Sequence, residues 1–174
     1  MDNAQAVTDG LNKAREVIVK YMLLRLEKAC DNLIADALAR REFEGFTGNT
    51  QTSYACGIYH NDVLQSMVIA EDNMKPPVRI KVQKGAKIHL EKPYEGEART
   101  TIGMVKVDES RFGAETAEDF LKSFKPSIKK GFSVAMTTGT EYSEYLENVR
   151  NLNVLTMTRR SSAEIILQEL KPDS

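Results

Sequence analysis

The sequence predicts an α+β fold: a long N-terminal helix packed on an antiparallel sheet, with a projecting β-hairpin arm and a short C-terminal helix. Three observations support this prediction. Residues 3–43 contain no proline and a single glycine, and good helix formers dominate them. Two β-rich segments follow, joined by an Asn-Asp pair that suits a two-residue hairpin turn. A Ser-Ser-Ala-Glu sequence near the C-terminus is typical of a helix start.

The first helix is expected to run from Asn3 to about Phe43, a length of roughly 50 to 60 Å at the rise of an α-helix. A main row of apolar residues recurs along it at three- and four-residue steps: Val7, Leu11, Ala14, Ile18, Met22, Leu26, Ala29, Leu33 and Ala37. A second row is formed by Val17, Tyr21, Leu24, Leu23, Cys30, Ile34 and Leu38. A helix that is apolar on more than one side needs more than one neighbour. Both rows could pack within this chain, or one could face another subunit.

The hairpin follows directly on the helix. Gly45 and Gly48 mark the helix end and a turn. The segments 52–60 and 63–70 read as strands, and the Asn61-Asp62 pair between them tolerates the positive φ angles of a tight turn.

The rest of the chain completes a single expected domain, residues 1–174, with a β-arm inserted at about 74–110. The arm begins after a Pro-Pro break and alternates apolar and charged residues. The remaining expected elements are a helix opened by the capping box Thr116–Asp119 and ending before Pro126, a strand at 132–136, a helix at 141–148 and a final helix opened by the capping box Ser161–Glu164.

Composition narrows the class of protein. The chain of 174 residues is 41% hydrophobic and carries 24 Lys+Arg against 25 Asp+Glu, which is typical of a folded protein without a general affinity for nucleic acid. Cys30 and Cys56 are expected to be buried thiols. We expect no signal peptide and no membrane span, and therefore synthesis and retention in the cytoplasm.

No motif indicates catalysis. His60 and His89 lack metal-ligand spacing, and no phosphate-binding or nucleophile-elbow motif occurs. Glu141, Glu144 and Glu147 recur every three residues and are interpreted as the solvated face of a short helix. We therefore expect no enzymatic activity, no cofactor and no metal.

The expected arm has an asymmetric charge. Its first half contains one acidic residue, Glu91, against the basic residues Lys75, Arg79, Lys81, Lys84, Lys87 and Lys92. These side chains could contact DNA phosphates. They could instead protect an exposed strand edge from unwanted pairing, or bind an acidic neighbouring protein.

The order of features resembles a known family. Thr47, Gly48, Thr50 and Ser53 match a Thr-Gly-x-Leu-x-x-Ser segment that follows the long helix, with Thr50 in place of the usual leucine. A later Tyr-Ala-x-Tyr-Val-Glu segment is matched by Tyr142, Ser143, Tyr145, Leu146 and Glu147. Over residues 5–60 and 130–170 the chain is similar to the tail-completion or neck proteins of tailed bacteriophages, also called head–tail joining or minor tail proteins. The Gly-Thr that usually follows is replaced by Asn148-Val149-Arg150, and residues 64–115 resemble an insertion.

The resemblance implies a structural virion protein, made in the host bacterial cytoplasm and located in the neck or tail. It would be a subunit of a homo-oligomeric ring that joins the capsid portal to the tail, with portal, adaptor or tail-tube proteins and packaged DNA as neighbours. Two different patches of each subunit would meet in such a ring. The expected interface residues are Ile18, Met22, Leu26, Leu33, Tyr142 and Tyr145. Two alternatives stay open: a nucleic-acid-binding accessory protein that uses the basic 75–92 segment, and a small enzyme.

Overall fold

The computed structural model describes residues 3–43, 45, 47–81, 104–107, 112–141 and 143–172, with the backbone alone described for 78–81 and 104–107. Its helices and strands are α1 (Asn3–Arg40), α2 (Asn49–Thr52), β1 (Tyr54–His60), β2 (Val63–Ile69), the 3₁₀ turn η1 (Ala70–Asn73), β3 (Val78–Lys81), β4 (Met104–Val107), α3 (Phe112–Ser123), β5 (Phe132–Thr138), α4 (Ser143–Asn148) and α5 (Thr156–Leu170). The α+β class and the long first helix are confirmed.

A three-stranded antiparallel sheet in the order β2-β1-β5 forms the centre of the molecule. The predicted hairpin is confirmed, because β1 and β2 pair directly. Asn61 and Asp62 form its turn with φ angles of 50° and 69°. Both turn residues therefore have the left-handed backbone that fits the twist of a two-residue hairpin.

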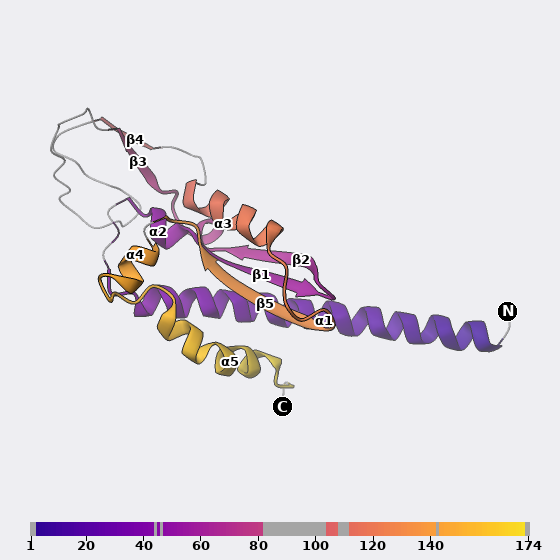
Figure 1. The fold of residues 1–174 in the computed structure, drawn as a ribbon. Helices are drawn as coiled ribbons and strands as arrows, with labels where there is room; N and C mark the ends of the chain where they lie inside the picture. The colour runs from indigo at the N-terminus through magenta and orange to yellow at the C-terminus, as the bar shows by residue number, and fades with distance from the viewer. Residues whose placement is uncertain are drawn as a thin grey trace.

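Helices cover both faces of the sheet (Figure 1). α1 and α5 lie on one face, and α3 lies on the other. Side chains alternate along β1 accordingly: Tyr54, Cys56 and Ile58 enter the core beneath α1, whereas Ala55 packs against α3. Because both faces are covered, β1 is apolar at nearly every position.

The junction between α1 and β1 is a tight, buried turn. Gly48 has φ 78°, a left-handed conformation that favours glycine, and α2 follows at once. The Ser53 hydroxyl lies 2.7 Å from that of Thr138 and so ties the junction to the end of β5. The predicted glycine turn is confirmed at Gly48.

α3 begins one turn earlier than predicted. The capping box at Thr116 is wrong, since Thr116 lies within the helix, where its hydroxyl donates to the Phe112 carbonyl. The helix start is capped instead by Asn49, whose Oδ1 accepts the Gly113 amide at 2.8 Å. Gly139, directly after β5, lets the chain pass close to the first turn of α3, because a Cβ at Gly139 would lie 1.8 Å from the Gly113 carbonyl oxygen.

The arm segment contains a separate two-stranded antiparallel sheet. β3 pairs with β4, with Val78 opposite Val107. The rest of the predicted 74–110 arm, residues 82–103 and 108–110, lies outside the described residues.

Candidate interaction surface on the first helix

The predicted main apolar row of α1 divides into two parts. Leu26, Leu33 and Ala37 are at most 3% exposed and belong to the core, together with Ala29, Cys30 and Ile34; we call these six residues the core face. Val7, Leu11 and Ile18, in the N-terminal half, are 62 to 67% exposed. The reason is length: a 38-residue helix spans about 57 Å, whereas seven-residue strands cover about 23 Å.

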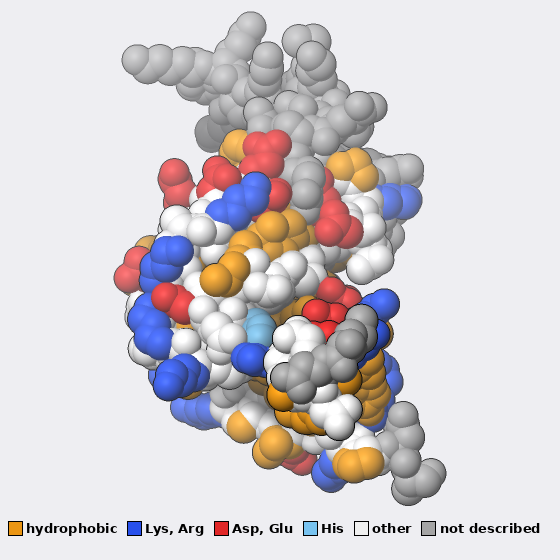
Figure 2. Space-filling model, turned by 90° about the vertical axis from the view of Figure 1, so that its right-hand side faces the viewer, with side chains coloured by type: hydrophobic (Ala, Val, Ile, Leu, Met, Phe, Trp, Pro, Cys, Tyr) orange, Lys and Arg blue, Asp and Glu red, His pale blue; other side chains and the backbone are white. Residues whose placement is uncertain are grey.

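The exposed part of α1 presents its apolar residues together. Val17, Tyr21 and Leu24 of the predicted second row are also exposed, and they join Val7, Leu11 and Ile18 in what we call the outer face. At about 100° per residue, the outer face is centred roughly 140° around the helix axis from the core face. Figure 2, viewed from the end where α1 protrudes, shows hydrophobic side chains exposed on this end of the molecule.

The residues predicted for an oligomer interface have different positions. Ile18 is exposed, Met22 is half-buried and Tyr145 is 50% exposed on α4. The interface prediction is wrong for Leu26 and Leu33, because both are buried in the core of this chain and present no surface to a partner. Tyr142 lies outside the described residues.

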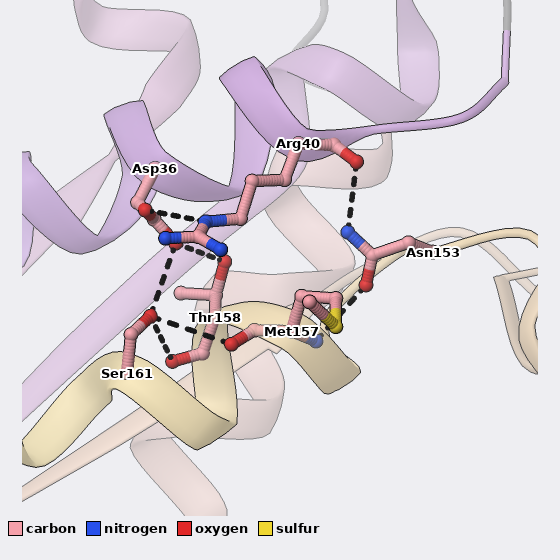
Figure 3. Close-up of polar contacts among 6 residues, drawn as sticks. All are labelled: Asp36, Arg40, Asn153, Met157, Thr158 and Ser161. Atoms are coloured by element: carbon pink, nitrogen blue, oxygen red, sulfur yellow. Dashed lines mark hydrogen bonds and ion pairs between the residues drawn. The ribbon is translucent and has the colours of Figure 1, made fainter.

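A polar cluster fastens α5 to the C-terminal part of α1 (Figure 3). The Asp36 carboxylate accepts hydrogen bonds from Thr158 at 2.8 Å and Ser161 at 3.4 Å, and pairs with Arg40 at 2.7 Å. Burial acts to raise the pKa of Asp36, but the hydrogen bonds and the Arg40 charge outweigh it and hold that pKa below its ordinary value. Thr158 is 1% exposed and the Asp36 side chain is 18% exposed, so the contact between them is partly buried.

Asn153 joins the ends of both helices. Its side-chain amide donates to the Arg40 carbonyl at the end of α1 at 2.9 Å, while its Oδ1 accepts the Met157 amide in the first turn of α5 at 3.0 Å. Backbone groups at helix ends lack partners within the helix. One buried side chain therefore satisfies a carbonyl of α1 and an amide of α5.

Glu147 provides a second cap for α5. Its carboxylate accepts the Thr156 amide at 2.7 Å and the Leu155 amide at 3.0 Å. Burial acts to raise the pKa of Glu147, but the hydrogen bonds from Thr156 and the neighbouring backbone amides together lower it. The interpretation of Glu147 as a solvated residue is therefore wrong, although Glu141 and Glu144 are exposed as expected.

These two caps also explain where α5 begins. Thr156 is its first residue, so the start predicted from Ser161 is wrong. Ser161 instead bonds back to the carbonyls of Met157 and Thr158 within the helix. Nothing local to residues 153–156 resembles a capping box, so sequence reasoning missed Glu147, which acts from another helix.

Residues of α5 line several hollows. One, of about 260 Å³, is largely apolar and opens between α5 and the edge strand β5; Val134, Met136, Leu155 and Ile166 are among the residues that line it. The second, of about 530 Å³, is more polar and more open, with Glu141, Glu144 and Arg159 among its lining residues. No described residue that lines these two hollows is a nucleophile paired with a base.

The cysteines and the described histidine are in structural surroundings. Cys30 and Cys56 are buried free thiols in mutual contact, which confirms the prediction of buried thiols; the contact with Cys30 and then burial raise the pKa of Cys56. His60 stacks on Phe132 with ring centroids 4.5 Å apart. Among the described residues, no group of three or more His, Cys, Asp or Glu could hold a metal ion.

The structure describes only a small part of the predicted basic surface on the 75–92 segment. Lys75 is exposed next to the two prolines. Arg79 and Lys81 lie on β3, where only the backbone is described, and Lys84, Lys87 and Lys92 lie outside the described residues.

Comparisons with known proteins give no relative: no family model, no curated protein and no solved structure matches the chain. In the part of the chain that the structure describes, no helix is both long and apolar enough to cross a membrane.

Proposed function

We propose that this chain is a structural virion protein, a subunit of an oligomeric ring in the neck that joins the capsid portal of a tailed phage to its tail. The observation that carries the proposal is the outer face of α1. Contiguous apolar surface on a folded protein marks an interaction site. Most helical stability in proteins comes from tertiary packing, and residues 3–18 are all exposed in this structure, so a partner would stabilise this half of α1.

The architecture supports a role in assembly more than one in catalysis. Among the described residues, the ionisable side chains with displaced pKa values have structural surroundings. Asp36 fastens α5 to α1, Glu147 caps α5, and Cys56 lies in the core. The Tyr54 and Tyr59 hydroxyls, whose pKa values are raised by burial, donate to backbone carbonyls. A catalytic group needs access to a substrate as well as a displaced pKa. An enzyme is therefore the least favoured function.

The sequence resemblance supports the location in a phage neck. Thr47, Gly48, Thr50 and Ser53, which carry the first match, form the turn between α1 and β1. Of the second match, Leu146 packs on the core and Glu147 caps α5. These matched positions thus have structural roles, and the whole assignment to a ring at the head–tail junction rests on this resemblance together with the outer face.

The principal alternative is a nucleic-acid-binding accessory protein. The six basic residues between Lys75 and Lys92, against a single Glu91, are the observation that favours it. Phosphate contacts by such residues would make DNA binding weaken steeply with salt. Retention on DNA that is lost at moderate salt, and lost again when these residues are replaced by glutamine, would favour this alternative.

Cryo-electron microscopy of the parent particle tests the proposal. Reconstruction of the head–tail junction is expected to contain density for this chain in a cyclic ring between portal and tail. A particle assembled without the chain serves as the control and should lack that density alone or fail to join head and tail. Mature particles that contain no copy of the chain would refute the proposal.

A further inference from the structure

The outer face of α1 has the spacing of a coiled-coil seam. Val7, Leu11, Ala14, Ile18 and Tyr21 follow one another at alternating steps of four and three residues. An average step of 3.5 residues keeps a seam on one side of a supercoiled helix and directs it toward another helix. All five residues are exposed, as is every residue of α1 from Asn3 to Ile18.

Polar residues occupy the opposite side of the same helix segment. Gln5, Asp9, Asn12, Glu16 and Lys20 fall at the positions that point away from the seam. The N-terminal half of α1 is therefore amphipathic by itself, with an apolar side that differs from the core face. This pattern specifies a helical partner for the outer face.

The seam is wider than a two-stranded coiled coil requires. Val17 and Leu24 lie beside it, at positions where a helix dimer usually carries charged residues, and both are more than half exposed. A helix with such a broad apolar side can contact a neighbour on each flank. The seam ends at Arg25, whose guanidinium lies 5.6 Å from the Tyr21 ring and donates to the Lys171 carbonyl at 2.7 Å.

The available area is sufficient for association. At about 100 Å² for each aliphatic or aromatic side chain, the six residues of the outer face present roughly 600 Å² per copy. Two such faces bury about 1,200 Å² together, the lower bound for a specific, stable interface. Further copies of the chain supply the same apolar face.

We propose that the N-terminal halves of α1 from three or more copies pack in parallel around a common axis, with their outer faces forming the core of a helical bundle. Rotation about one axis makes all the helices parallel and in register, so that Val7 of each copy lies near Val7 of the next. The bundle would be the self-assembly contact of the proposed ring. The inference rests on the proposed function for its biological setting, but it is tested separately.

Sedimentation velocity of the full chain, over a wide range of micromolar concentrations, tests the bundle. The wild-type chain is expected to form a species larger than a dimer. Leu11→Asp should weaken association at least about thirty-fold, as expected when a charge is placed in the apolar core of an interface. Asn12→Asp is the matched control, because it adds the same charge at the adjacent position on the polar side and should leave association unchanged.

Cysteine cross-linking tests the parallel arrangement. Both native cysteines are 0% exposed, so an introduced thiol is the reactive one in the folded chain. Val7→Cys should give disulfide-linked subunits under mild oxidation, whereas Asp9→Cys on the polar side should not. An antiparallel pair would place Val7 near Tyr21 of its neighbour, about 21 Å from the other Val7, and would prevent the link.

Three results would overturn the inference: a monomer at every concentration, association unaffected by Leu11→Asp, or no cross-link through Val7→Cys. Circular dichroism of each variant checks that it is folded. A monomeric chain that nevertheless occupies the head–tail junction would remove the bundle and leave the proposed function. A chain that forms the bundle but is missing from the particle would remove the proposed function and leave the bundle.

Discussion

Glu147 offers the sharpest test of how this fold is held together. Its carboxylate accepts the amides of Leu155 and Thr156 at the start of α5, a helix without a side-chain cap at Leu155. Replacing Glu147 by alanine leaves both amides without their protein acceptor and removes a negative charge from the positive end of the helix.

The size of the effect follows from these contacts. Hydrogen bonds to a charged group contribute about 1.5 to 3 kcal/mol each, but Thr156 is exposed, so water replaces part of the lost contact there. We expect Glu147→Ala to lower the free energy of unfolding by about 2 kcal/mol, and Glu147→Gln, which keeps an acceptor oxygen, by about 1 kcal/mol. With a urea m-value of about 2 to 3 kcal/mol/M, the midpoint for Glu147→Ala falls by about 0.7 to 1 M.

Urea unfolding followed by far-ultraviolet circular dichroism measures the change, since the chain has no tryptophan. Glu144→Ala is the matched control: it removes the same side chain from an exposed position of the same helix and should stay within about 0.5 kcal/mol of wild type. Equal midpoints for the Glu144 and Glu147 variants would refute the capping role.

The pH dependence gives a second readout of the same contact. The pKa of Glu147 is lower in the folded chain than its ordinary value, so its stabilisation is complete above about pH 5 and is lost as the pH falls through the folded-state pKa. The difference between wild type and Glu147→Ala should therefore be largest at neutral pH and shrink below about pH 4.

Three further predictions concern other parts of the molecule. The folded-state pKa of Asp36 is also lowered, so Asp36→Asn should destabilise the chain at pH 7 and lose that effect in acid, as measured by urea unfolding at several pH values. Gly10→Ala should stabilise α1 by about 1 kcal/mol of helix propensity, since a Cβ at Gly10 meets no atom within 4 Å. The helical circular-dichroism signal and the thermal midpoint should both rise, and an unchanged helical signal would contradict this. Cys30 and Cys56 should react with a thiol reagent only as fast as the chain unfolds, because both are buried; rapid reaction of the native chain would show that the core opens locally.

The long helix and the hairpin could be predicted from the sequence because interactions between neighbouring residues determine them. The long proline-free segment became α1, and Asn61-Asp62 formed the hairpin turn with positive φ angles. These features depend on contacts between residues a few positions apart. The starts of α3 and α5 were misplaced for the complementary reason, since their caps, Asn49 and Glu147, come from other elements.

The sequence by itself determined that α1 is apolar on more than one side. Only the tertiary structure decided which residues form the core, because the predicted main row continues at three- and four-residue steps from Val7 to Ala37, and those steps do not mark where burial begins. The physical reason is the mismatch in length between a helix of about 57 Å and strands of about 23 Å. The sheet buries Leu26 and Leu33, and the same pattern nearer the N-terminus is left exposed at Leu11 and Ile18.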